Sequence, residues 1–361
     1  MKILLTGSDG YIGSVVGPYL IRRGHSVTGL DTGFYSDGSL FEDKQIENIP
    51  CTRKDLRTVT ETDLAGFDAV VHLAELSNDP LGQHKPELTY AINHQGTVAL
   101  AHKCRNIGIS RFVYTSSCSV YGAGTGDFKT EESETNPQTA YAQCKVLVER
   151  DVSAMSTDDF SPTFLRNATA YGPSPRMRFD LVLNNLAGLA WTAKEIRMTS
   201  DGTPWRPLVH VRDIAHAIAC SIEAPRSVVH NQIFNVGRTS ENYQVKDIAE
   251  IIANIFPNCK LAFGTSDGDN RSYRVGFDKI KSGLPGFQCR NTAATGAAEL
   301  LDLFKKIHMN RETFEFRTFT RLKQLKHLLQ TEQIDGRFFW NVENGSKHTG
   351  KTTCATGPNA N

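Results

Sequence analysis

A tyrosine and a lysine lie four residues apart at Tyr141 and Lys145, a spacing that suits acid/base chemistry. Positions four apart lie on one face of a helix, so the phenol and the ammonium can converge. A free tyrosine titrates at a pH of about 10, and a neighbouring ammonium favours its phenolate. Tyr141 is therefore a candidate general acid or base near neutral pH, although the same spacing is also typical of a surface helix pair.

A run of hydroxyl side chains, from Thr115 to Ser117, supplies a second group for the same chemistry. The run ends a predicted strand of a parallel sheet, and ligands bind at the carboxyl ends of such strands. A hydroxyl of Ser117 could hydrogen-bond the same substrate oxygen as Tyr141, whereas its simpler interpretation is a loop cap. The serine, the tyrosine and the lysine together predict one site that holds a substrate oxygen.

The stretch GSDGYIG follows the first predicted strand and opens the first helix, with glycines at Gly7, Gly10 and Gly13. Glycines allow a tight turn, a close backbone approach to a pyrophosphate and helix-on-strand packing, while the helix N-terminus supplies N–H donors. Asp31 ends the second predicted strand, 18 residues after Gly13. There a carboxylate can accept ribose hydroxyls and would repel a 2′-phosphate, which favours NAD over NADP. Each feature alone also fits an ordinary turn.

Apolar runs alternate with helical patterns along the first half of the chain and would position these residues. Strands are predicted at Ile3–Leu5, Val27–Leu30, Ala69–Leu73, Arg111–Tyr114 and Thr163–Arg166. Helices are predicted up to about Gly24, over about Tyr90–Ile107 and Tyr141–Ala154, and over Leu181–Ala193, with amphipathic candidates at 244–256, 296–308 and 319–330. Strands that alternate with helices imply a parallel sheet with right-handed crossovers. We therefore predict an α/β fold with a Rossmann-type doubly wound parallel sheet and a smaller C-terminal substrate-binding lobe.

Prolines and arginines interrupt this alternation after Tyr171 and predict the start of the second lobe. Two later apolar segments, Leu208–Val211 and Gln232–Val236, are expected to return to the first sheet. The leucine stripe in 319–330 could pack on the body or pair with a second copy, and 122–139 is expected to be a loop. The predicted organisation is an NAD-binding domain at 1–172 with returning segments at about 206–240, a substrate-binding lobe at 173–205 and 241–340, and a disordered tail at 341–361.

Composition excludes several classes of protein. The 361 residues are 39% hydrophobic and 22% charged, which is typical of globular chains. A formal net charge of +1 disfavours a nucleic-acid partner, and no apolar run approaches the ~18 residues of a membrane span. The eight cysteines contain no CxxC pair or zinc-like spacing, so we expect reduced thiols, no metal and a cytoplasmic location. Three histidines are expected to be structural, namely His72, His210 and His216.

Taken together, the motifs resemble those of the extended short-chain dehydrogenase/reductases, specifically the NAD-dependent epimerase/dehydratases that act on nucleotide-activated sugars. The resemblance covers about residues 1–290. It is carried by GSDGYIG at 7–13, Asp31, DLR at 55–57, HLAE at 72–75, Asn93 in INHQGT, SSCSVYG at 116–122, YAQCK at 141–145, LRNATAYGP at 165–173, RPLVHVRD at 206–213 and Arg271 in the stretch DNRSYRVGF.

This resemblance implies a bound NAD, a catalytic triad and an anchor for a nucleotide diphosphate. The implied cofactor residues are Gly7, Gly10, Tyr11, Ile12, Gly13, Asp31, Tyr141 and Lys145, together with Asp55, Leu56, Leu73 and Ala74. Of these, Asp55 and Leu56 would lie beside the adenine, and Leu73 and Ala74 would line the cofactor cleft. The implied catalytic triad is Ser117, Tyr141 and Lys145. The implied substrate residues are Asn167, Asn185, Arg206 and Arg271, and a guanidinium can bind a diphosphate bidentately. The resemblance further implies a homodimer formed through the helices at 90–107 and 141–154.

The resemblance leaves more than one reaction open. In the sugar 4,6-dehydratases an Asp-Glu pair follows the position of Ser117, whereas this chain has Cys118 and Ser119 there. We therefore expect a 4-epimerase, which oxidises the sugar at C4 to a 4-keto intermediate and then returns the hydride. The alternative is a dehydratase in which the Cys118 thiol donates a proton, although a buried small hydrophobe is the simpler interpretation of that residue. A third possibility is a non-catalytic NAD-sensing protein.

Overall fold

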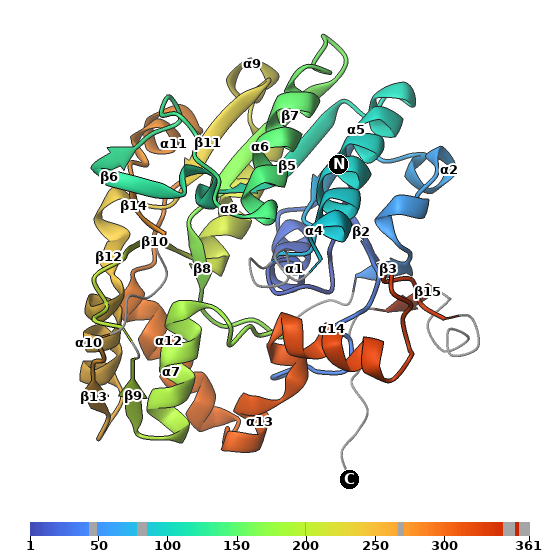
Figure 1. Ribbon diagram of the computed structural model, residues 1–361. Helices are drawn as coiled ribbons and strands as arrows, with labels where there is room; N and C mark the ends of the chain where they lie inside the picture. Colours follow the sequence, from blue (N-terminus) through green and yellow to red (C-terminus); the bar gives the residue numbers. More distant parts are fainter. Residues whose placement is uncertain (43–48, 78–84, 199, 266–270, 342–350, 354–361) are drawn as a thin grey trace.

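The centre of the molecule is a mostly parallel β-sheet (Figure 1). The computed structural model describes residues 1–42, 49–77, 85–198, 200–265, 271–341 and 351–353. In these residues the sheet has the order β11-β7-β5-β4-β1-β2-β3-β15. Its strands are β1 (Lys2–Thr6), β2 (Ser26–Asp31), β3 (Pro50–Arg53), β4 (Ala69–His72), β5 (Arg111–Ser117), β7 (Ser161–Asn167), β11 (Gln232–Val236) and β15 (Lys351–Thr353). The predicted Rossmann-type fold is thereby confirmed, and the strand order reverses between β1 and β4, where ligands bind in such sheets.

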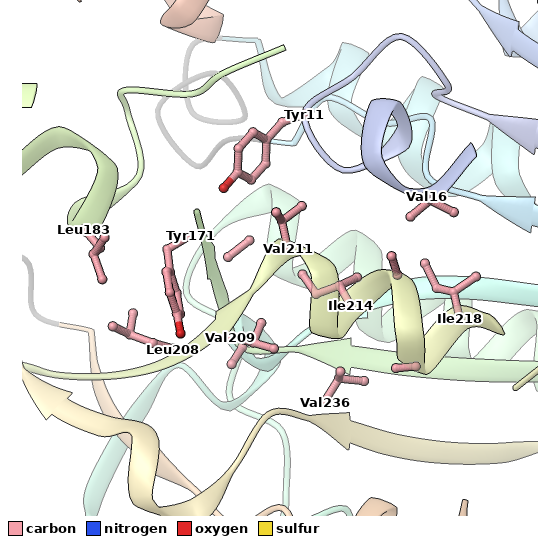
Figure 2. Close-up of a cluster of buried hydrophobic side chains, with 14 of the residues drawn as sticks. Tyr11, Val16, Tyr171, Leu183, Leu208, Val209, Val211, Ile214, Ile218 and Val236 are labelled. Carbon is pink, nitrogen blue, oxygen red and sulfur yellow. The ribbon is translucent and has the colours of Figure 1, made fainter. Parts of the chain in front are cut away.

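Helices cover both faces of this sheet, which is why its strands are apolar on both sides. In β4, Ala69 and Val71 face one core and Val70 faces the other. On the first face lie α1 (Gly13–Arg22) and α8 (Val211–Glu223). On the second face lie η1 (Leu56–Thr58), α2 (Glu61–Leu64), α4 (Pro86–Thr89), the π-helical η2 (Tyr90–Gly96), α5 (Thr97–Asn106) and α6 (Ala140–Ser153). Figure 2 shows Ile214 and Ile218 of α8 between Val16 of α1 and the sheet.

A smaller lobe packs beside the carboxyl ends of the strands. Its three small sheets are built from β8 (Thr169–Tyr171), β10 (Trp205–His210) and β12 (Asn242–Gln244); β9 (Glu195–Arg197) and β13 (Lys260–Ala262); and β6 (Ala123–Lys129) and β14 (Ser272–Val275). Its main helices are α7 (Val182–Thr192), α10 (Val245–Ile255) and α12 (Ala293–Lys306). The remaining short helices are η3 (Cys118–Tyr121), α9 (Arg226–Val229), η4 (Thr239–Glu241), α11 (Asp278–Gly283), α13 (Arg311–Glu315) and η5 (Arg317–Phe319). No helix in the described ranges is long and apolar enough to cross a bilayer.

Three sequence predictions differ from this arrangement. Of the two segments expected to return to the first sheet, 232–236 does so as β11, but 208–210 lies in β10 and pairs with β8 in a smaller sheet. The expected loop at 122–139 contains β6, whose partner is β14, far away in the sequence. In the expected disordered tail, Lys351–Thr353 form β15, which pairs antiparallel with β3. The rest of the tail beyond Asn341 lies outside the described residues.

A fourth difference concerns the C-terminal helix α14 (Arg321–Gln330), which the sequence places in the substrate-binding lobe. Its leucine stripe packs on the body, where Leu325 and Leu328 share a buried cluster with Phe34 and Leu76. The side chain of Trp340, farther along, donates to the backbone oxygen of Thr32, at 2.7 Å. All of these contacts are to residues 1–172, the half of the molecule that is predicted to bind NAD (the cofactor half). The segment from α14 to Trp340 therefore packs on that half (Figure 1) and not on the predicted substrate-binding lobe.

Buried charges fix α6 against the sheet. Glu149 of α6 accepts from the guanidinium of Arg166 on β7 at 2.7 Å, and it also accepts from the hydroxyl of Ser116 on β5. Both charged side chains are about 5% exposed. An unpaired charge at this depth would be costly, so the pair restricts where α6 can lie on the strands.

Replacing Glu149 by glutamine should lower the free energy of unfolding by about 3 kcal/mol, because the Arg166 guanidinium would stay buried without its counter-charge. Urea denaturation measures this loss. The matched control is Glu315→Gln, which breaks the exposed pair of Glu315 with Arg311 and should leave the unfolding midpoint unchanged. Equal midpoints for the two variants would contradict the role assigned to the buried pair.

Candidate active site

A cavity of about 640 Å³ opens where the carboxyl ends of the strands meet the smaller lobe. Residues from both parts of the molecule line it. The sequence-predicted residues that line it are Gly7, Gly10, Tyr11, Ile12, Gly13, Asp31, Asp55, Leu56, Leu73, Ala74, Ser117, Tyr141, Lys145, Asn167, Asn185, Arg206 and Arg271. Cys118 is the candidate that the structure does not bring to the cavity.

The glycine turn can pack this closely against neighbouring backbone only because it lacks side chains. Gly7 has a φ of +73°, and a Cβ built there would lie 2.8 Å from the backbone nitrogen of Ala74. A Cβ on Gly13 would lie 2.1 Å from the Gly7 carbonyl oxygen. Helix α1 begins at this turn, and the first backbone N–H groups of a helix are suited to bind a pyrophosphate. The turn therefore fits the dinucleotide that the sequence predicts.

Asp31 sits at the end of β2 beside this turn. Its carboxylate accepts from the backbone nitrogens of Asp9, at 3.0 Å, and Gly33, at 2.8 Å. Burial raises the pKa of Asp31, and the neighbouring Asp9 raises it further. A carboxylate can accept more than two hydrogen bonds, so ribose hydroxyls fit here as well. The other predicted carboxylate, Asp55, is held by Arg57 at 2.7 Å.

The three catalytic candidates reach the cavity from β5 and α6. Tyr141 and Lys145 lie on one face of α6, and the Lys145 ammonium nitrogen is 5.3 Å from the centre of the Tyr141 ring. Ser117 ends β5, where its hydroxyl also accepts from the backbone nitrogen of Ser119 at 3.1 Å. Thr139 caps the start of α6 by accepting from the Ala142 nitrogen, so Tyr141 lies in the first turn of an ordered helix. The arrangement can exchange a proton with a hydroxyl of a bound ligand.

Cys118 is turned away from these groups. Its thiol is buried and donates to the backbone oxygen of Arg166 at 3.1 Å. Burial raises the pKa of the Cys118 thiol well above its ordinary value. A thiol in this position is a small buried packing residue, which is the simpler of the two interpretations that the sequence allowed.

The substrate-side candidates present amides and guanidiniums to the cavity. Asn167 is buried, and its Oδ1 has no hydrogen-bond partner among the described residues. Asn185 donates to the Phe179 backbone oxygen at 2.8 Å. Arg206 donates to the backbone oxygen of Arg271, which keeps these two arginines next to each other. Two arginines on one cavity wall are suited to a diphosphate.

Five charged residues of the cavity wall are not among the predicted site residues, namely Lys54, Glu75, Arg178, Asp180 and Arg321. The carboxylate of Glu75 lies 2.5 Å from the Lys145 ammonium. Arg178 pairs with Asp180 at 2.9 Å. Arg321, the first residue of α14, lies 3.9 Å over the ring of Tyr35, and burial lowers its pKa to about 10. Glu75 ends the HLAE motif, and a charged residue beside apolar ones at a strand end could have indicated a site residue. Arg321 lies beyond the stretch that carries the resemblance, so no motif indicated it.

Replacing Gly7 by alanine should weaken NAD binding by about 100-fold, because the positive φ and the contact with Ala74 would deform the turn. Isothermal titration calorimetry measures the dissociation constant. The matched control is Gly24→Ala, where φ is +87° but a Cβ meets nothing within 4 Å. Undiminished binding in Gly7→Ala, or an equal loss in Gly24→Ala, would argue against a cofactor at this turn.

Comparison with known proteins agrees with this geometry. Residues 3–237 match the NAD dependent epimerase/dehydratase family. The UDP-glucose 4-epimerase of Corynebacterium glutamicum is 29% identical over 270 residues, which are 70% of this chain and 79% of that protein. A UDP-N-acetyl-alpha-D-glucosaminuronate decarboxylase of Bacillus cytotoxicus is 27% identical over 260 residues, again 70% of this chain and 79% of that protein.

Solved structures give the same result. The structure of MoeE5 in complex with UDP-glucose and NAD superposes with a TM-score of 0.73 at 25% identity, over 86% of this chain and 100% of that one. The family match extends over more than half of this chain, and it confirms the resemblance that the motifs carried. The chain therefore belongs to the NAD dependent epimerase/dehydratase family.

Proposed function

We propose that this protein is an NAD-dependent nucleotide-sugar epimerase that acts by transient oxidation at C4 of the sugar. The observation that carries the proposal is that Ser117, Tyr141 and Lys145 line the same cavity as the glycine turn and the arginine pair. The relatives act on or bind UDP-sugars by name, so a UDP-sugar is the substrate class we propose.

Tyr141 carries the proton chemistry in this proposal. Its phenolate accepts the proton of the C4 hydroxyl while Ser117 holds the same oxygen, and the ammonium of Lys145 stabilises the phenolate. NAD, when bound, supplies a reversible hydride acceptor for the C4 carbon. The ketone then presents its other face and is reduced, and Tyr141 returns the proton to the oxygen. No further acid or base is required, because the proton that leaves is the proton that returns.

The substrate-side residues anchor the part of the molecule that does not react. Arg206 and Arg271 provide positive charge for the diphosphate, and Asn167 and Asn185 offer amide groups. Anchoring the diphosphate presents the sugar to the reacting groups and leaves the bonds to the sugar free to rotate. That freedom is what reduction on the opposite face requires.

The alternative is a dehydratase that uses the Cys118 thiol as proton donor. The epimerase is favoured over it because that thiol is buried against the Arg166 backbone and does not line the cavity. The alternative of a non-catalytic NAD-sensing protein fails if the purified protein turns over any nucleotide sugar. The predicted homodimer through the helices at 90–107 and 141–154 stays a prediction, as does the cytoplasmic location, which free thiols at the described cysteines would suit.

Tyr141→Phe should reduce turnover of a UDP-sugar at least 100-fold, because the ring remains but the exchangeable proton is lost. Dissociation constants for NAD should stay within a few-fold of the unaltered protein. Mass spectrometry with chromatography of the products checks the reaction. A product of unchanged mass and altered sugar configuration is expected, whereas a product that has lost one water molecule would contradict epimerisation.

Arg206→Met should raise the KM for the nucleotide sugar by about 10- to 100-fold with a much smaller change in kcat, since it removes a charge-assisted anchor remote from the reacting carbon. Steady-state kinetics measures both constants. Arg197→Met is the matched control, because Arg197 lies in the same lobe with its side chain 76% exposed. The anchor role would be refuted by an Arg206→Met variant whose KM is no higher than that of the control.

A further inference from the structure

The ammonium of Lys145 lies in a buried cluster that includes a carboxylate. Its nitrogen is 2.5 Å from Oε2 of Glu75 and also donates to the backbone oxygen of Thr115. The side chains of Lys145 and Glu75 are each only 3% exposed. The phenol of Tyr114 donates to Oε1 of Glu75 at 2.6 Å. Both oxygens of Glu75 therefore accept hydrogen bonds, an arrangement that suits an ionised carboxylate and not a neutral acid.

Three titratable groups around this pair are uncharged near neutral pH, and the charged ones, Arg178 and Glu149, are each paired with an opposite charge. Burial and the Lys145 charge lower the pKa of His72 on β4 to about 3, so the imidazole is neutral. Burial raises the pKa of the Cys144 thiol on α6 to about 12, and burial also raises the pKa of Tyr114 on β5 well above its ordinary value. Arg178 faces Tyr141 from the segment before α7, but it is paired with Asp180. Burial raises the pKa of Glu75 itself, and the ammonium opposes that rise.

We propose that Glu75 is a positioning residue that holds the Lys145 ammonium in place and balances its charge, and so sets the pH at which Tyr141 gains and loses its proton. The proposal rests on the proposed function, in which Lys145 acts on Tyr141. An uncompensated ammonium 5.3 Å from the ring would strongly favour the phenolate. With Glu75 beside it the pair is close to neutral as seen from Tyr141. A phenol whose pKa is not lowered too far can both accept a proton as a base and return it as an acid.

The decisive measurement is the ionisation of Tyr141 in Glu75→Gln, a variant that keeps the shape and removes the charge. The ultraviolet difference spectrum between each protein and its Tyr141→Phe counterpart follows this one phenol through a pH titration. We expect the titration midpoint to fall by about one pH unit in Glu75→Gln, since one negative charge leaves the cluster. The acid limb of the pH–rate profile should fall by the same amount.

Two further variants make the outcome unambiguous. Glu87→Gln applies the same chemical change to an exposed residue of α4 and should leave the midpoint unaltered. Tyr114→Phe removes a hydrogen bond that lowers the pKa of Glu75, so Glu75 carries less negative charge and the midpoint should move in the same direction by a smaller amount. This variant also covers the case in which Glu75→Gln folds poorly. A midpoint that stays in place or rises in both Glu75→Gln and Tyr114→Phe would overturn the proposal. A rise would mean that the ammonium moves away from Tyr141 once Glu75 is lost, so that Glu75 only holds the lysine and does not balance its charge.

The titration uses neither sugar nor NAD, so it separates the two proposals. If no nucleotide sugar is turned over but the midpoint falls, the proposed reaction fails and the role of Glu75 in this cluster stands. If the enzyme epimerises a UDP-sugar but the midpoint does not move, the role of Glu75 fails and the proposed reaction stands.

Discussion

The structure of the site depends on buried charges along one face of α6. Tyr141, Lys145 and Glu149 are spaced by four residues, so all three point the same way from the helix. Lys145 reaches Glu75 and the Thr115 backbone, and Glu149 reaches Ser116 and Arg166. A charge left without its partner at this depth would cost several kcal/mol. The helix can therefore pack on β5 in essentially one register, and that register brings Tyr141 to the cavity that Ser117 lines.

Most of the fold was predictable because its signals are local. Apolar runs of β1 and β4 and the glycines at Gly7 and Gly13 depend on nearby residues alone, and the predicted helix at 141–154 agrees with α6 to within one residue at either end. Strand pairing is not local. The apolar pattern of 208–210 predicts a strand but cannot say that its partner is β8, and β6 forms only because β14 returns beside it.

The site was predictable to the extent that it repeats family motifs. Every predicted residue but Cys118 lines the cavity, because the motifs lie at strand ends that a parallel sheet gathers at one edge. Glu75, Arg178 and Arg321 were missed since a charged residue in a sequence is usually exposed, and only the folded chain shows that their partners make burial possible. Arg321 had no motif at all, and its place follows from the packing of Leu325 and Leu328 against the cofactor half.

The route of the C-terminal segment brings a distant part of the chain to the cavity. The family match ends at residue 237, yet Arg321, the first residue of α14, lines the same cavity. Part of the cavity wall thus lies in a stretch of the sequence outside the family match. A substitution at Arg321 would therefore reshape this cavity while every residue of the matched stretch stays as it is.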